Sequence, residues 1–154
     1  MREHTINDDM RISCPDTFSV MDEEERYRVL RDRAYKNFGV WDHEAHIIMT
    51  ASWRPMGKIG LFFADPKSMA KRTRSYSGRL VPGFSGEEIK EHSIAGRKAY
   101  RFSYTYTVEN MPHRGWTYLL KTDKAMYTVN FAARGDDRQA EGTVRSIMES
   151  MKIL

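Results

Sequence analysis

The sequence predicts a protein of the α+β class with an antiparallel sheet of about six strands. Apolar and polar residues alternate over 98–108, 115–122 and 125–133, which is the period of half-buried strands. Apolar residues then recur at helical spacing after residue 136, which predicts a closing amphipathic helix. Together these patterns indicate an aromatic-rich β-meander covered by a helix.

Length and composition fit one globular domain. The chain has 154 residues, of which 40% are hydrophobic and 30% charged, as in ordinary folded proteins. Residues 1–9 are polar and charged, so we expect a flexible N-terminal arm followed by a single domain over 10–154. No repeat or long linker divides that domain.

The first half of the chain opens with a strand and a charged helix. Met10–Cys14 is predicted as a strand that Pro15 ends. An acidic run begins at Asp22 and is followed by arginines up to Arg33, the charge order that a helix dipole favours. Ala34 continues the narrow apolar stripe of this helix.

Two further strands are expected before the middle of the chain. Glu44–Arg54 alternates, with Ile47, Met49 and Trp53 on one side, and Pro55 ends the pattern. The apolar run Ile59–Phe63 is predicted as another strand.

Asp65-Pro66 predicts the start of a long helix, with Asp as N-cap and Pro at the first helical position. Its apolar positions recur at intervals of four, three and four residues, so we expect one core-facing stripe. Pro82-Gly83 ends the helix. The stripe consists of Met69, Thr73, Tyr76 and Leu80.

Three long strands and a helix complete the chain. Ile89–Ile94 precedes the meander, a loop over 110–114 joins its first two long strands, and Asp123-Lys124 forms the tip of its last hairpin. Asp136 and Asp137 are expected to open the final helix. The core-facing positions of that helix are Ala140, Val144, Ile147, Met148 and Met151.

The aromatic strand supplies the first candidate binding surface. Tyrosine hydroxyls need partners when buried, so this face either lies under a helix or lines a partly wet groove. The loop that carries His113 and Arg114 could add contacts at its edge. The proposed face consists of Tyr100, Tyr104 and Tyr106, with Trp116 from the next strand.

A basic helix face is the second candidate surface. A solvated face is its simplest interpretation, and an anionic protein partner or nucleic acid are the alternatives. The net charge of +4 does not by itself indicate nucleic acid. The residues of this face are Lys67, Lys71, Arg72, Arg74 and Arg79.

No catalytic residue, cofactor or metal site is predicted. Cys14 is the one cysteine, which excludes an intramolecular disulfide and indicates a buried thiol. His43 and His46 lie at a strand entry, where residues three apart point to opposite faces and cannot share a metal. The chain shows neither a signal-peptide core nor a membrane-spanning run, so we expect a cytoplasmic protein without membrane insertion.

Several motifs resemble the PsbP-like superfamily. They are the strand end Cys14-Pro15, the helix start Asp65-Pro66, the segment 94–100 (IAGRKAY) and the closing segment 146–153 (SIMESMKI). This group includes photosystem extrinsic subunits, a Ran-binding nuclear-import factor and many bacterial domains of unknown function. The resemblance implies an α/β/α-type sandwich and a role in binding other proteins, but no functional residue.

The leading functional hypothesis is a non-catalytic protein-binding or adaptor module, so the expected partner is another protein. A small-molecule or lipid binder that uses the Tyr/Trp face is an alternative from a different class. An enzyme whose site forms only in three dimensions is the third hypothesis. The sequence predicts no oligomeric state.

Overall fold

The computed structural model describes residues 1–32, 36–135 and 138–154, and confirms the α+β class. Its described helices are α1 (Glu23–Leu30), α2 (Lys58–Phe63), α3 (Pro66–Leu80) and α4 (Arg138–Glu149). The described strands exceed the expected six, because β1, β4 and three two-residue strands add to those predicted. They are β1 (Arg2–Ile6), β2 (Met10–Cys14), β3 (Ser19–Val20), β4 (Lys36–Asp42), β5 (Ile47–Pro55), β6 (Ser85–Gly86), β7 (Lys90–Ile94), β8 (Arg97–Val108), β9 (Met111–Lys121), β10 (Ala125–Arg134) and β11 (Lys152–Ile153).

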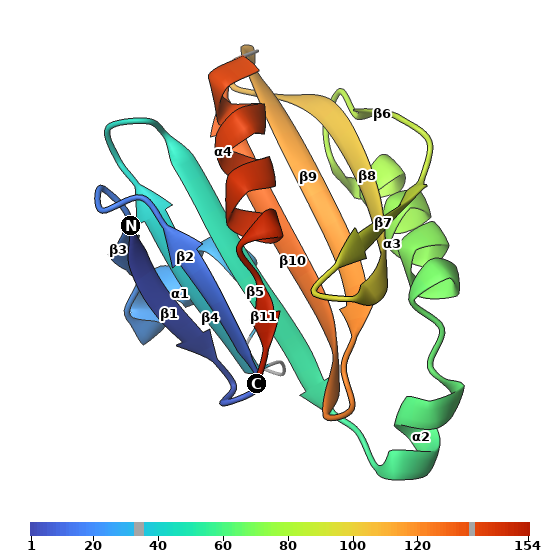
Figure 1. The fold of residues 1–154 in the computed structure, drawn as a ribbon. Helices are drawn as coiled ribbons and strands as arrows, with labels where there is room; N and C mark the ends of the chain where they lie inside the picture. The colour runs from blue at the N-terminus through green and yellow to red at the C-terminus, as the bar shows by residue number, and fades with distance from the viewer. Residues whose placement is uncertain (33–35, 136–137) are drawn as a thin grey trace.

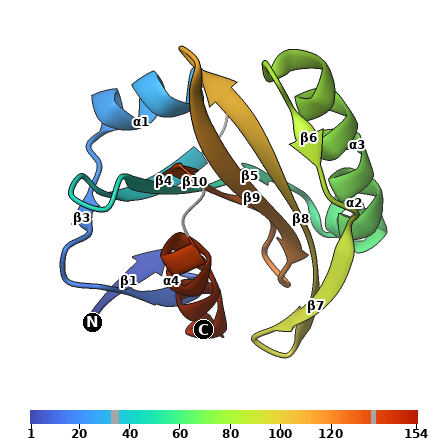
Figure 2. The ribbon, with the colours of Figure 1, turned by 90° about the horizontal axis from the view of Figure 1, so that it is seen from above.

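An eight-stranded antiparallel sheet forms the centre of the described structure. Its strand order is β3-β4-β5-β10-β9-β8-β6, and β7 also pairs with β8 (Figure 1). A smaller sheet has the order β1-β2-β11. Seen from above in Figure 2, α1 and α3 lie on one side of the large sheet, and α4 and the small sheet lie on the other. We call these the α3 face and the α4 face.

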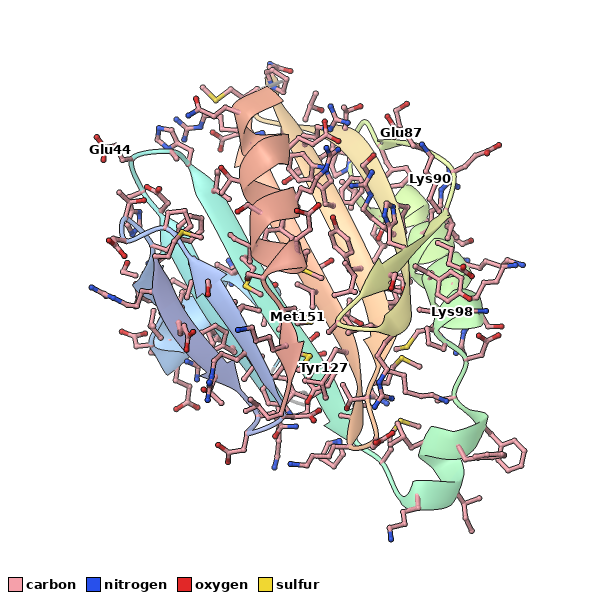
Figure 3. All side chains as sticks on the ribbon, viewed as in Figure 1. Glu44, Glu87, Lys90, Lys98, Tyr127 and Met151 are labelled. Atoms are coloured by element: carbon pink, nitrogen blue, oxygen red, sulfur yellow. The ribbon has the colours of Figure 1, made fainter. Side chains whose placement is uncertain are left out.

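The main core lies between the large sheet, α4 and the small sheet. The predicted stripe of α4 is buried there, from Ala140 to Met151. The opening of that helix at Asp136 and Asp137 lies outside the described residues. Figure 3 shows Tyr127 and Met151 in the middle of the molecule, whereas Glu44, Lys90 and Lys98 lie at its margins.

The N-terminal segment is not a flexible arm. Residues 2–6 form β1, which pairs with β2 from Arg2 opposite Cys14 to Ile6 opposite Met10. Ile6 is fully buried in the main core, and burying it stabilises the strand. The expectation of an arm was wrong because β1 contains mostly polar residues and shows no clear apolar alternation.

A strand and a hairpin were missed between the first helix and β5. The helix ends at Leu30, with Arg31 in the left-handed conformation, and the predicted continuation at Arg33 and Ala34 lies outside the described residues. β4 follows and pairs with β5. The turn before β5 is held by Asp42, whose carboxylate accepts hydrogen bonds at 3.0 Å from the backbone N–H groups of Glu44 and Ala45.

The run Ile59–Phe63 is helical, not a strand as expected. α2 begins after Gly57, and its only described buried residue is Leu61. A short apolar run fits either element by pattern alone, so local sequence does not decide between them.

α3 begins at Asp65 and Pro66 as predicted, but it presents a different side to the sheet. Ala70 is buried against Phe102 and Leu119, and Met69 packs beside them. Tyr76 and Leu80, expected in the core-facing stripe, are exposed. The predicted stripe was wrong because the residue at the contact with the sheet is an alanine. Ala70 lets the helix approach the sheet closely, but so small a side chain carries little hydrophobic signal in the sequence.

The meander agrees with prediction except at one turn. The expected loop over 110–114 is a two-residue turn at Glu109 and Asn110, both with positive φ, and β9 begins already at Met111. Positive φ at both central positions gives the tight turn that matches the twist of antiparallel strands. The β9–β10 hairpin turns at Asp123 and Lys124, as expected.

Candidate functional site

The aromatic face of β8 lies under α3. Tyr100, Phe102 and Tyr104 belong to the cluster that packs beneath this helix. Tyr104 stacks on Phe84 with ring centroids 5.1 Å apart, and its ring covers Gly115 on β9. A Cβ at position 115 would lie 2.3 Å from the Tyr104 ring, so the tyrosine fills the space that the glycine leaves. This part of the face is therefore packed rather than open.

Trp116 does not belong to the face that the sequence assigned to it. Its partner across the ladder is Ser103, whereas Tyr104 pairs with Gly115, so Trp116 points to the α4 face. It is fully buried in the main core, and the Arg114 guanidinium lies 5.4 Å from its ring centroid. Arg114 also contacts the Glu87 carboxylate at 3.8 Å. These two candidates are separated from the tyrosines by the sheet itself.

Tyr106 and His113 lie together at the far end of the α3 face. Their ring centroids are 5.3 Å apart, and both line a shallow pocket of about 340 Å³. Burial, together with the neighbouring Tyr104, raises the pKa of Tyr106 to about 12, so its hydroxyl stays protonated at neutral pH. Of the predicted tyrosines, Tyr106 is the one that lines a described pocket.

The predicted basic face is divided in the structure. Lys67 and Lys71 are exposed. Arg74 faces the sheet edge, where its Nε and Nη2 donate to the backbone oxygens of Glu87 and Gly86 at 2.8 and 2.9 Å. Arg72 and Arg79 line the largest described groove. Arg74 therefore has a structural contact, Arg72 and Arg79 lie at a groove, and Lys67 and Lys71 stay exposed binding candidates.

This largest groove, which we call the α3 groove, lies between α3 and strands β5 and β10. Its volume is about 760 Å³, within the range of small-molecule sites. The chain enters and leaves α2 along its edge, through Pro55 and Met56 and through Ala64 and Asp65. Its remaining lining residues are Ser52, Trp53, Arg54, Met69, Arg72, Thr73, Ser75, Tyr76, Arg79, Met126 and Thr128.

The α3 groove carries an excess of positive charge. Arg54, Arg72 and Arg79 line it, and Asp65 is its one acidic residue among the described lining. The Asp65 carboxylate caps α3 by accepting hydrogen bonds from Ser68 Oγ at 2.7 Å and from the Lys67 backbone N–H at 3.1 Å. These bonds, that of Ser68 foremost, hold the pKa of Asp65 below its ordinary value, so the group is ionised but engaged by the helix.

Beside this groove, α2 exposes a patch of large apolar side chains. Ile59, Phe62 and Phe63 are 78%, 76% and 76% exposed, and we call them the α2 patch. Figure 1 shows α2 standing away from the rest of the molecule. On its inner side, Lys121 Nζ donates to the backbone oxygens of Leu61 and Ala64 at 3.0 and 2.9 Å.

The remaining chemical candidates show no assembled site in the described part of the chain. Burial raises the pKa of the Cys14 thiol to about 11, which keeps it protonated and unreactive. His43 and His46 are exposed, and His43 lies against the ring of Trp41. No group of three or more His, Cys, Asp or Glu side chains among the described residues could hold a metal ion. None of the described helices is long and apolar enough to cross a membrane.

Sequence reasoning missed both the α3 groove and the α2 patch. The groove combines residues of β5, α3 and β10 that are far apart in sequence. The α2 patch was assigned to a strand, which would have buried part of it. The usable signal was the density of large apolar residues after Pro55, next to a lysine and two glycines.

Solved structures similar to this chain share its architecture. Cyanobacterial PsbP (CyanoP) from Synechocystis sp. PCC 6803 has a TM-score of 0.68, at 7% identity over 99% of this chain and 92% of that chain. The chain has a PsbP-like fold. This confirms the fold that the sequence motifs implied.

Two bacterial proteins extend the comparison. LpqN of Mycobacterium tuberculosis, described as involved in cell envelope biogenesis, has a TM-score of 0.62 at 14% identity over 94% of this chain and 82% of that chain. PA94 of Pseudomonas aeruginosa, a protein of unknown function and putative regulator, has a TM-score of 0.57 at 12% identity over 97% and 94%. No protein-family model matches the sequence, and no curated protein is significantly similar to it. At these identities the similarity concerns the fold alone.

Proposed function

We propose that this protein is a non-catalytic binding module that binds another protein through the α2 patch. The exposure of Ile59, Phe62 and Phe63 carries the proposal, since each has more than three-quarters of its side chain in solvent. Soluble proteins seldom leave large apolar side chains together in water unless the surface binds something. A partner that covers this patch would remove the free-energy cost of exposing these side chains to water.

The geometry of α2 suits a preformed contact. Residues 59, 62 and 63 are three and four positions apart, so they lie on one side of the helix. The Phe62 and Phe63 rings meet edge to face with centroids 5.2 Å apart. Aromatic side chains held in place before binding are typical of the residues that contribute most to protein interfaces.

The attachment of α2 to the body supports the same function. Leu61 points inward and is buried, and Lys121 binds the carbonyl groups at the end of the helix. These contacts hold the patch outward without covering it. A partner therefore needs to order few residues of α2 on binding, which lowers the entropic cost of association.

Site-specific photo-crosslinking tests this function. A benzophenone amino acid replaces Phe62 in cells that naturally make the protein, and adducts are identified after irradiation. We expect a defined protein adduct at this position, which disappears when Ile59→Ser and Phe63→Ser are added. The aromatic replacement preserves the chemistry of the patch.

Val20 provides the matched control. It is an exposed apolar residue on the edge strand β3, away from α2 (Figure 1). The same photoreactive residue at position 20 should not form the Phe62 adduct. An absent adduct at position 62, or the same adduct at both positions, would contradict the proposed interface.

A further inference from the structure

We propose that the α3 groove binds a small anionic amphiphile, a molecule with a hydrocarbon body and a carboxylate or phosphate head. This site is separate from the α2 patch, and neither depends on the other. Its volume of about 760 Å³ suits such a ligand.

The walls of the groove are apolar and adaptable. Met56, Met69 and Met126 line it from the end of β5, from α3 and from β10. Methionine is unbranched and polarisable, so it fits irregular hydrocarbon shapes. The Tyr76 ring adds a flat apolar surface from α3. These side chains would contact the hydrocarbon body.

The charges select an anionic head. Arg72 and Arg79 are seven residues apart on α3, which places both on one side of the helix above the groove. Arg54 lies across from them on β5. Guanidinium groups bind carboxylate and phosphate oxygens through paired hydrogen bonds. The one acidic lining residue, Asp65, is engaged in capping α3, so it leaves this positive field in place.

The shape of the groove favours a small molecule over an extended peptide. Pro55, Met56, Ala64 and Asp65 all line it, so the two chain segments that flank α2 lie along its border. The floor strands β5 and β10 pair with each other and with β4 and β9, which uses their backbone hydrogen-bonding groups. A peptide strand therefore has no sheet edge to pair with at this floor.

Isothermal titration calorimetry with the purified protein tests the site. Dodecanoate, added below its micelle concentration, should bind saturably to the wild-type protein. Dodecyl phosphate should compete for the same site. Competition by the phosphate identifies a site that accepts either head, and failure of the phosphate alone narrows the ligand to carboxylates. An uncharged dodecyl alcohol should bind at least about tenfold more weakly.

Two double variants, each lacking two positive charges, distinguish binding in the groove from general electrostatic attraction of the anion to the basic helix. R72Q/R79Q removes two of the three groove arginines and should weaken dodecanoate binding by about tenfold or more. K67Q/K71Q removes two charges from exposed positions of the same helix and should leave the affinity unchanged. Circular dichroism checks that both variants are folded.

Three results would overturn the proposal. They are the absence of saturable dodecanoate binding to the folded wild-type protein, equal affinity for the uncharged alcohol, and equal weakening by both double variants. The cross-links at Phe62 are independent of all three, so failure here leaves the proposed protein interface standing.

Discussion

At the scale of single residues, Asp9 joins parts of the chain that are distant in sequence. Its side chain is only 2% exposed. One carboxylate oxygen accepts hydrogen bonds from Thr122 Oγ1 at 2.6 Å and from the Tyr127 hydroxyl at 2.7 Å. Its backbone oxygen accepts a bond from the Leu154 N–H at 2.8 Å. Asp9 therefore connects the first hairpin, the β9–β10 hairpin and the C-terminus.

Asp9→Ala should lower the free energy of unfolding by about 2–4 kcal/mol, because it leaves the hydroxyls of Thr122 and Tyr127 buried without their shared acceptor. Urea denaturation measures this change. Asp16→Ala is the control, since its exposed carboxylate contacts only the N-terminal ammonium among its described contacts and should cost less than about 1 kcal/mol. Equal effects of the two variants would show that the Asp9 network contributes little.

At the scale of elements, α2 depends on a contact that is remote in sequence. Lys121 Nζ binds the backbone oxygens of Leu61, Phe62 and Ala64 at 3.0, 3.4 and 2.9 Å. The last carbonyls of a helix lack partners within it, and a cation there is favourable. The contact explains how so short a helix keeps its position with three apolar side chains outside.

Lys121→Met should loosen α2 while preserving most of the sheet. The variant keeps the length of the aliphatic side chain but removes the charged donor, so backbone amides of 58–64 should exchange with solvent about tenfold faster. Hydrogen exchange followed by mass spectrometry measures this. Lys124→Met is the control because Lys124 Nζ donates to Asp8 rather than to α2. Unchanged exchange in 58–64 would refute the role of Lys121.

Elements with a strong local pattern were predictable from the sequence. β8, β10 and α4 agree with prediction within a few residues, because their alternation or helical stripe is set by neighbours along the chain. β4 was missed since Gly39 interrupts its apolar pattern, and burial along it does not alternate strictly. β1 was missed because its pairing with β2, rather than its composition, makes it a strand.

At the scale of the whole molecule, the candidate sites depend on how elements are placed. Strand alternation correctly grouped the tyrosines of β8, but only the β8–β9 register shows that Trp116 lies on the opposite face. The α3 groove likewise depends on where α3 crosses the sheet, and Ala70 gave little indication of that position. Faces of single strands were predictable, whereas surfaces built from several elements were not.

The buried His4 and the partly buried His92 predict how the stability of the whole fold depends on pH. Burial foremost, then Arg101, Lys90 and Arg145, lowers the pKa of His92 below 6.5, and burial and Arg2 lower that of His4. The unfolded chain therefore binds more protons as pH falls below about 6.5. The stability that depends on neutral His4 and His92 is complete above their unfolded pKa. It is lost as pH falls through their lower pKa values in the folded protein.

The urea midpoint should accordingly decrease as pH falls from about 7 to about 5. His92→Gln removes one of the two groups and should reduce this slope, because the variant has no imidazole to protonate against the surrounding cations. A midpoint that stays constant over this pH interval, or an unchanged slope in the variant, would contradict the assignment of this pH dependence to the histidines.

The central claim is that α2 is the surface that binds a partner protein. Nuclear magnetic resonance of the isotope-labelled protein, titrated with the partner recovered by cross-linking at Phe62, tests it most directly. We expect the amide signals of residues 56–64 to shift or broaden on binding, while those at the β7–β8 turn stay in place. Changes confined to β7 and β8, with 56–64 unaffected, would contradict it.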